Sequence, residues 1–310
     1  MTFEITVPQE YDGMKPKNFL SKQIQVPFHE LLNLLRDKRI TQNGKKIKQE
    51  TILKAGDIIK FWPKDLLPKT TDKKHKTSQD LGIKTIFENE DFIVLNKKAG
   101  IVVQGAQDSS ESLSLHLAYL KEKNLDTSEY EYMHVHRIDK DTSGIIVIGK
   151  NLVTTRDLNK VFHDKQIIKK YWCVCLGHLK DKEGKIELNL DRNPEGSRQK
   201  VCVNPQGKPT LSVYKVLKEF THKGKFFSLV EIEIKTGFMH QIRVHMKHLG
   251  HPLLGDVMYG SSLVNEEFKH IMPRQALHAH EIAFAYQGQE YSFLAPLPQD
   301  LERLLSVLEE

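Results

Sequence analysis

One polar segment, residues 134–144, concentrates side chains that could do chemistry. It has the sequence HVHRIDKDTSG and leads into an apolar, strand-like stretch. Loops fixed to a rigid sheet commonly carry reactive groups. Asp139 and Asp141 could form a general acid/base pair, and His134 and His136, two residues apart, could bind a metal on one strand face. Taken alone, the residues also suit a polar turn, closed by its threonine and serine, with no chemical role.

A second segment, HQIRVHMKHLGH at residues 240–251, is rich in histidine and also suggests a metal. The zinc signature HExxH is absent, because Gln-Ile-Arg-Val stands between His240 and His245 and supplies no acid at the required position. The phosphate-binding loops GxxxxGK[ST] and GxGxxG are absent from the sequence as well. We therefore expect helical packing here and no metal, and we keep a metal-dependent hydrolase as an alternative function.

Charge is distributed unevenly along the 310 residues. The formal net charge is +6, and residues 1–82 carry all of this excess, whereas residues 83–310 are balanced. A basic appendage on a neutral body suits attraction to a polyanion, although a solvated lysine-rich module has the same composition.

The cysteines and the N-terminal residues indicate the cellular compartment of the protein. Cys173, Cys175 and Cys202 form no CxxC pair, so we expect reduced thiols, with the first two buried on one strand face. The first residues hold no apolar leader, and no apolar run approaches the ~20 residues of a membrane-spanning helix. We therefore expect a cytoplasmic protein.

Residues 1–62 are expected to form a small α+β module, and residues 63–82 a flexible basic linker. In the module, apolar residues recur at helical spacing between 28 and 35, an Asn-Gly turn follows at 43–44, and a strand is expected at 58–62. This layout resembles an S4-like RNA-binding module, although an unrelated α+β module would show nearly the same pattern. The basic residues expected to bind RNA phosphates are Arg36, Arg39, Lys45 and Lys46.

The remainder, residues 83–310, is expected to be an α+β domain with a mixed, mainly antiparallel sheet. Strand-like segments cluster in long runs between isolated helices, which argues against a repeated βαβ pattern. Strands are expected near 83–88, 91–96, 144–149, 171–176, 185–190, 199–203, 211–218, 226–235 and 277–286, and helices near 110–123, 152–164, 239–249 and 299–308.

Four ordered motifs resemble those of the RluA-type pseudouridine synthases, and the S4-like module favours the ribosomal large-subunit (RluC-like) members. HRIDKDTSG at 136–144 resembles the family signature HRLDxxTSG. FIVLNKKAG at 92–100 resembles the strand before NKPxG, and KKYWCVCLG at 169–177 resembles the KxY strand. TGFMHQIRVH at 236–245, followed by GHP and GDVMYG, resembles the block TGRxHQIRVH…GHP…GDxxYG.

The resemblance implies an RNA uridine isomerase with the pseudouridine synthase fold and no cofactor. Such enzymes break the N1–C1′ bond of uridine, rotate the base and rejoin it through C5. By resemblance, Asp139 is catalytic, Arg243 keeps it ionised, and Tyr171 stacks on the uracil and takes the C5 proton. The residues do not decide whether Asp139 attacks the sugar or removes a proton from it.

The resemblance also implies RNA contacts around this aspartate. Arg137 would fill the gap left by a uridine flipped out of its stack. Further RNA-binding residues are expected at His136, Thr142, Lys170, His240 and Gln241. Large-subunit ribosomal RNA is the expected partner of a monomeric enzyme, with transfer RNA as an alternative substrate.

Several positions depart from the family pattern. Lys98 stands in place of proline, Gln104 in place of histidine, and Phe238 and Met239 in place of arginine and a small polar residue. The lost arginine removes an expected phosphate contact. A further alternative is therefore an RNA-binding or ribosome-assembly factor that has kept the fold without turnover.

Overall fold

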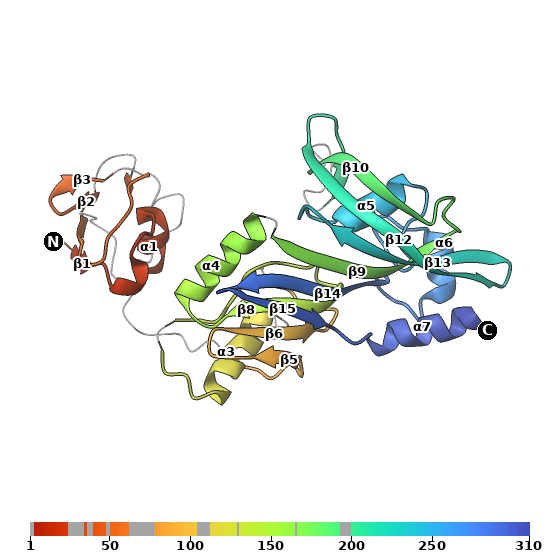
Figure 1. Ribbon diagram of the computed structural model, residues 1–310, viewed down its shortest axis with the longest axis horizontal. Coiled ribbons are helices and arrows are strands. Elements are labelled where there is room, and N and C mark those ends of the chain that lie inside the picture. The colour runs from red at the N-terminus through yellow and green to blue at the C-terminus, as the bar shows by residue number, and fades with distance from the viewer. Residues whose placement is uncertain are drawn as a thin grey trace. The chain divides into compact units, whose positions relative to one another are not determined.

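The computed structural model describes residues 3–23, 34–35, 40–47, 50–61, 78–103, 112–128, 130–164, 166–192 and 200–310. Two compact units, Met1–Lys76 and Thr77–Glu310, make up the chain (Figure 1). Several predictions lie outside the described residues; they concern Arg36, Arg39, Gln104, most of the helix expected at 28–35 and the linker at 63–77. No described helix is long and apolar enough to cross a membrane.

The first unit contains a four-stranded antiparallel sheet in the order β1 (Phe3–Thr6), β4 (Ile58–Phe61), β2 (Ile40–Gln42) and β3 (Lys45–Lys46). A 3₁₀ turn, Gln9–Tyr11, and helix α1 (Pro16–Gln23) follow β1. Between β2 and β3, Asn43 and Gly44 have φ angles of 49° and 76°. Positive φ at both central residues is what a tight two-residue hairpin requires, so the predicted turn is confirmed.

The second unit is built on an eleven-stranded sheet (Figure 1). The main order is β11-β10-β12-β13-β9-β14-β8-β6-β5; β15 also pairs with β14, and β7 with β8. The bounds are β5 Lys84–Glu88, β6 Phe92–Lys97, β7 Met133–His134, β8 Ser143–Gly149, β9 Ile167–Leu176, β10 Glu183–Arg192, β11 Val201–Val203, β12 Lys208–His222, β13 Lys225–Ile234, β14 Leu277–Tyr286 and β15 Gln289–Leu294.

Nearly every pairing in this sheet is antiparallel, which confirms the predicted α+β class. The exception is the parallel contact of β8 with β14, in which Ser143 pairs with His278 and Gly144 with Ala279. The expected strands are present, whereas β7 and β15 were not predicted. β9 also begins four residues before the predicted start at Tyr171, so it includes both lysines that precede this tyrosine.

Five helices accompany the sheet: α3 (Leu113–Lys123), α4 (Leu152–His163), α5 (Gln241–His248), α6 (Ser262–Phe268) and α7 (Gln299–Glu309). Of these, α6 was not predicted. Leu113, Leu117 and Leu120 of α3 pack in one apolar cluster, and Leu158 of α4 packs in another.

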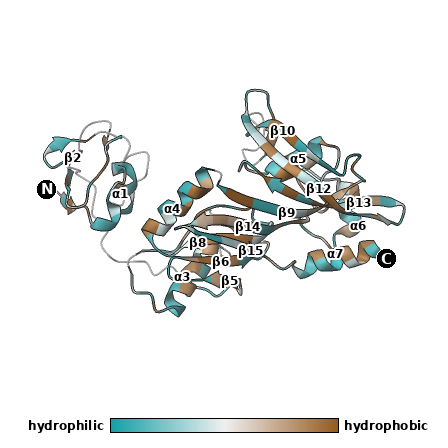
Figure 2. Ribbon diagram, viewed as in Figure 1, coloured by the Kyte–Doolittle hydropathy of each residue, from teal (hydrophilic) through white to brown (hydrophobic). Residues whose placement is uncertain are grey.

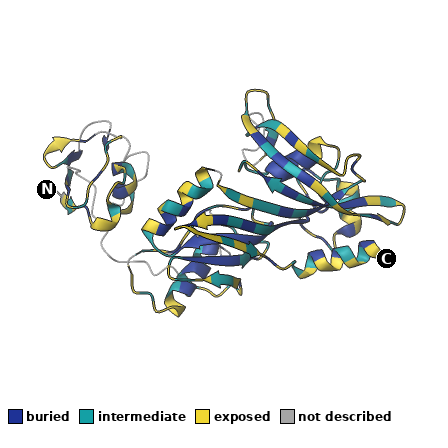
Figure 3. Ribbon diagram, in the orientation of Figure 1, coloured by how far each residue is buried: buried dark blue, intermediate teal, exposed yellow. Residues whose placement is uncertain are grey.

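Strand β8 lies between these two clusters. Ile146 and Ile148 belong to the first, and Ile145 and Val147 to the second. Burial on both faces explains the apolar run at residues 145–148 of β8, and every residue of this strand is buried. Figures 2 and 3 colour the ribbon by hydropathy and by burial. The predicted burial of Cys173 and Cys175 on one face of β9 is confirmed.

Gly144, at the contact between β8 and β14, yields a stability prediction. Its φ is 111°, and a Cβ built there would lie 2.2 Å from the carbonyl oxygen of Ala279. Gly144→Ala should therefore lower the free energy of unfolding by about 3 kcal/mol or more, through both strain and overpacking. Gly224→Ala is the matched control, because Gly224 has a φ of 71° with nothing within 4 Å. It should cost only about 1–2 kcal/mol in urea unfolding. Equal losses of unfolding free energy in the two variants would contradict the prediction that contact with the Ala279 backbone adds to the cost of Gly144→Ala.

Candidate active site

The loop before β8 carries Asp139, and a buried lysine fixes its backbone. Lys97, at the end of β6, is fully buried, and its ammonium donates to the carbonyls of Lys98 (2.8 Å), Ile101 (3.0 Å) and Lys140 (2.8 Å). The Lys140 carbonyl also accepts from the N–H of Gly100 at 3.0 Å. Burial and the charge of Arg274 lower the pKa of Lys97 to about 7, and the charges of Asp141 and Asp139 oppose that shift. The NKKAG segment thus holds the backbone directly after Asp139.

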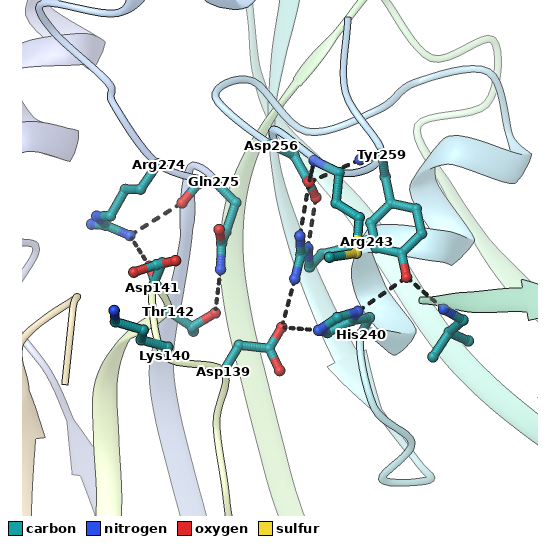
Figure 4. A network of polar contacts seen from close by, with 12 residues as sticks. Asp139, Lys140, Asp141, Thr142, His240, Arg243, Asp256, Tyr259, Arg274 and Gln275 are labelled. Atoms are coloured by element: carbon teal, nitrogen blue, oxygen red, sulfur yellow. Dashed lines mark hydrogen bonds and ion pairs between the residues drawn. The ribbon is translucent and has the colours of Figure 1, made fainter. Parts of the chain in front are cut away.

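A second cation, Arg274, holds the far side of the same loop (Figure 4). Its Nη1 donates to the carbonyl of Asp141 at 2.9 Å. Its Nε and Nη2 form a two-point pair with Asp300 of α7, at 2.7 and 2.9 Å. Nη2 also donates to the hydroxyl of Ser143 at 3.2 Å, and that hydroxyl is bonded to His278. The C-terminal helix is therefore connected to the Asp139 loop through one guanidinium.

Arg243 of α5 faces Asp139 across the site (Figure 4). Its Nη1 lies 3.2 Å from Asp139 Oδ2, and its Nε and Nη2 bind Asp256 at 2.7 and 2.8 Å. Its guanidinium also lies over the Tyr259 ring, with 5.0 Å to the centroid. The planar fork of arginine suits this shared role, because one edge binds Asp256 while Nη1 points at Asp139.

Asp256 is fully buried and holds Arg243 in place. Burial opposes its ionisation, but hydrogen bonds from Arg243 and from the N–H groups of Met258 and Tyr259 hold the pKa of this carboxyl below its ordinary value. Asp256 and Tyr259 belong to the GDVMYG segment. The motif was recognised in the sequence, but no role for these two residues was predicted from it.

His240 is the second side chain that faces Asp139. It caps α5 in the left-handed region, with a φ of 56°, which is an uncommon conformation for histidine. Its Nδ1 lies 3.0 Å from the Tyr259 hydroxyl, and its Nε2 lies 3.8 Å from Asp139 Oδ2. When Tyr259 donates to Nδ1, Nε2 carries the ring proton toward the carboxylate. Burial lowers the pKa of His240, and the charge of Asp139 opposes that effect.

These groups border a cavity of about 860 Å³. Tyr171 on β9 is buried in its wall, and burial together with the charge of Asp139 raises the pKa of the phenol, which therefore stays protonated. Other lining residues come from the Asp139 loop, from α4 and from the segment before α5; they include Arg137, Phe162, Lys169, Phe238 and His240. The cavity volume lies in the range of ligand-binding sites.

Three residues expected to bind RNA line the cavity and also have contacts within the protein. Gln241 is buried; its Oε1 accepts from Thr236 and from the Phe238 N–H, and its Nε2 donates to Leu211 and Ser212. His136 accepts from the Val147 N–H at 3.0 Å and stacks on Phe162. Burial lowers the pKa of His136 to about 3.

Thr142, the third of these residues, is buried, and its hydroxyl accepts from Gln275 at 3.4 Å. Gln241, His136 and Thr142 thus shape the cavity through contacts with the protein itself. Of the other expected RNA contacts, Arg137 lines the cavity with an exposed side chain, and Lys45 and Lys46 are exposed on β3 of the first unit.

The two lysines before Tyr171 lie on opposite faces of β9. Lys170 pairs with Glu281 at 2.9 Å and is not among the cavity residues, whereas Lys169 lines the cavity. Side chains alternate along a strand, so Lys169 shares the face of Tyr171. The place of Lys169 could have been predicted from the sequence. If Tyr171 faces the cleft from a strand, the residue two positions earlier faces the cleft as well.

The departures at 238 and 239 place apolar groups at the cavity edge. Phe238 and Met239 pack against a cluster of Leu190, Val201, Val244 and Tyr259. Lys98, in the usual proline position, donates to the Leu81 carbonyl at 3.2 Å. None of these contacts involves Asp139.

Two further histidines of residues 240–251 have separate protein partners. His245 is buried against Thr210 at 2.8 Å, and His251 contacts the Leu176 carbonyl at 2.8 Å. Within the described residues, no three His, Cys, Asp or Glu side chains are grouped so that they could hold a metal ion.

Comparison with known proteins identifies two families along the chain. Residues 91–248 match the model of RNA pseudouridylate synthase, and residues 3–59 match the RluD ribosomal pseudouridine synthase N-terminal domain. The chain is 30% identical to the ribosomal large subunit pseudouridine synthase C of Vibrio vulnificus, over 98% of this chain and 96% of that protein. It is 31% identical to an uncharacterized RNA pseudouridine synthase of Chlorobaculum parvum, with the same coverage.

Solved structures show the same fold. Human RNA pseudouridylate synthase domain containing 4 aligns with a TM-score of 0.60 and 23% identity, over 72% of this chain and 92% of that one. Human RNA pseudouridylate synthase domain containing 1 aligns with a TM-score of 0.58 and 24% identity, over 73% and 94%. At these identities the likeness concerns the fold.

The contacts of Arg243 predict that loss of Arg243 and loss of the Asp139 charge change the free energy of unfolding by different amounts. Arg243→Met should lower the free energy of unfolding by about 3–5 kcal/mol, because it leaves Asp256 charged and buried without its partner. Asp139→Asn should cost less than about 1 kcal/mol, since the Asp139 side chain is 25% exposed. Urea unfolding measures both values.

The double variant Arg243→Met/Asp256→Leu tests the cause. It should recover part of the stability that Arg243→Met loses, because the buried charge is gone. If Arg243→Met unfolded at the same urea concentration as Asp139→Asn, Arg243 would have no role in neutralising Asp256.

Proposed function

Since the chain belongs to the RNA pseudouridylate synthase family and is an RNA pseudouridine synthase, we propose that it acts on large-subunit ribosomal RNA with Asp139 as its catalytic carboxylate. One observation carries the assignment of the residue: Asp139 Oδ2 lies 3.2 Å from Arg243 Nη1 at the wall of a cavity that Tyr171 also lines. The substrate proposal is supported by the names of relatives such as the Vibrio vulnificus protein.

The proposed reaction needs Asp139 ionised and pointed into the cavity. The adjacent guanidinium stabilises the charged carboxylate, and Asp256 fixes the guanidinium from the other side. The carboxylate then attacks the ribose or removes a proton from it, and the N1–C1′ bond breaks. The uracil rotates and C5 bonds to C1′. C5 then loses a proton, N1 gains one, and the Asp139 carboxylate returns to its starting state. Atoms balance without any external group, because the product is an isomer of the substrate.

Tyr171 is proposed to hold the detached uracil. Its ring is part of the cavity wall, and aromatic stacking contributes roughly 1–3 kcal/mol per base while it tolerates rotation in the ring plane. Because the phenol stays protonated, we favour this stacking role over removal of the C5 proton.

Arg137 is proposed to support extrusion of the uridine. A base stacked in folded RNA cannot reach a buried carboxylate, and flipping it costs a few kcal/mol. Arg137 lies two residues before Asp139, at the cavity, with an exposed side chain that can occupy the vacated position. The exposed Lys45 and Lys46 of the first unit would bind phosphates elsewhere on the RNA.

The proposal is tested with in vitro transcribed 23S ribosomal RNA and the full chain. The wild type should form pseudouridine at specific positions, and Asp139→Asn should slow this by at least about 10²–10⁴-fold. Asp181→Asn, at an exposed position between β9 and β10, is the charge-matched control and should retain the wild-type rate. Pseudouridine mapping by chemical adduct and primer extension gives the positions and rates.

Three results would overturn parts of this proposal. Wild-type rates in Asp139→Asn would remove the catalytic assignment. Modification of transfer RNA alone in a parallel reaction would replace the substrate. Binding to 23S RNA with no modified base would favour the assembly-factor alternative, against which the Asp139–Arg243 pair argues.

A further inference from the structure

The cavity holds a cation, Lys169, that the mechanism above does not use. Its side chain lines the cavity and is only partly exposed. Within the part of the chain that the structure describes, no carboxylate pairs with it, and burial is the only influence that lowers its pKa. A half-buried ammonium without an acid is costly for the fold, which indicates that its partner comes from outside the protein.

Several of the neighbouring charged groups have protein partners, and the exposed Arg192 also lines the cavity. Arg243 is shared by Asp139 and Asp256, so this cluster of three keeps a net negative charge. Lys235, which also lines the cavity, pairs with Glu233. A strand of RNA that enters the cavity therefore brings phosphates toward a carboxylate-rich cluster, and it needs a cation to offset the repulsion.

The position of Lys169 suits a phosphate beside the reacting nucleotide. Lys169 and Tyr171 lie on the same face of β9, about 7 Å apart along the strand. A Cβ added to Gly237 would lie 3.9 Å from Lys169 Nζ. The ammonium therefore faces a glycine backbone, and the absence of a side chain there leaves space for a ligand.

The sequence around the cavity agrees with this placement. Phe238, next to Gly237, packs on the apolar cluster of Leu190, Val201, Val244 and Tyr259 and offers no charge to RNA. Lys169 Nζ lies beside Gly237, so its charge stands next to the segment in which position 238 has none.

We propose that Lys169 binds a backbone phosphate adjacent to the target uridine, and that it is the cation that positions the RNA strand beside Tyr171. This inference rests on the proposed function, because it takes the nucleotide at Tyr171 to be the reacting uridine. Lys170, which the sequence suggested as an RNA contact, pairs with Glu281 on the other face of β9 and is assigned no such role.

The test compares Lys169→Met with Lys169→Arg, Lys218→Met and Lys170→Met in the full chain, with 23S ribosomal RNA as the substrate. Lys169→Met should raise KM by about 10-fold with kcat within about 2-fold, and Lys169→Arg should restore most of the affinity. The slope of log KM against log salt concentration should fall by about 0.7, the value for one phosphate on a single strand. Lys218→Met, which removes a cation paired with Glu309 far along the chain, should leave KM and slope unchanged.

Lys170→Met provides the decisive comparison, since it removes an adjacent lysine of the same strand. A larger effect on KM or on the salt slope in Lys170→Met than in Lys169→Met would overturn the inference. So would a fall in kcat with unchanged KM in Lys169→Met, because the ammonium would then act on the reacting groups. Thermal unfolding of each variant separates these outcomes from loss of the fold.

A binding measurement separates this inference from the proposed function. In the Asp139→Asn background, fluorescence anisotropy with a labelled single-stranded oligouridylate should show the same loss of salt dependence for Lys169→Met. Suppose that wild-type protein did not modify 23S RNA, but Lys169→Met still reduced the salt dependence of oligouridylate binding. The substrate proposal would then fail and the phosphate contact would stand. If wild-type protein modified 23S RNA and the slopes were equal, the phosphate contact alone would fail.

Discussion

The guanidinium of Arg243 lies between two carboxylates with different surroundings, and the site depends on that difference. Asp256 is fully buried and takes two hydrogen bonds from Arg243, whereas Asp139 takes one and borders the cavity. A buried carboxylate can stay charged only when a cation and hydrogen bonds offset its lost hydration. Asp256 therefore fixes the guanidinium, and the free Nη1 is left to orient Asp139. Arginine is required because lysine offers no planar fork that could serve both partners.

A rigid backbone around Asp139 complements this pair. The carbonyl of Lys140 is held by Lys97, and the carbonyl of Asp141 by Arg274, so buried cations from β6 and from the segment before β14 bind successive peptide groups. These contacts fix the backbone of a short polar loop whose Ile138 side chain packs in the same apolar cluster as α3. Lys97 and Arg274 lie 177 residues apart in the sequence, so the site depends on segments from distant parts of the second unit.

The residues that line the cavity differ in their contacts with the rest of the protein. Gln241, His136 and Thr142 line the cavity and also have protein partners, so they help to shape the site. Phe238 packs into an apolar cluster, and this departure from the family pattern leaves Asp139 and Arg243 untouched.

The sequence by itself determined the α+β class, most strands and helices of the second unit, the Asn43–Gly44 turn, and the motifs that contain Asp139, Tyr171 and Arg243. Local periodicity and turn chemistry are sufficient for the fold class, the elements and the turn, whereas the motifs were identified by their resemblance to the RluA-type family. Only the tertiary structure decided which residues those motifs bring together: Asp256 behind Arg243, Arg274 behind the loop, and Lys169 in place of Lys170 at the cavity. Such contacts join positions far apart in the chain or depend on which strand face is turned inward, and neither follows from local pattern alone.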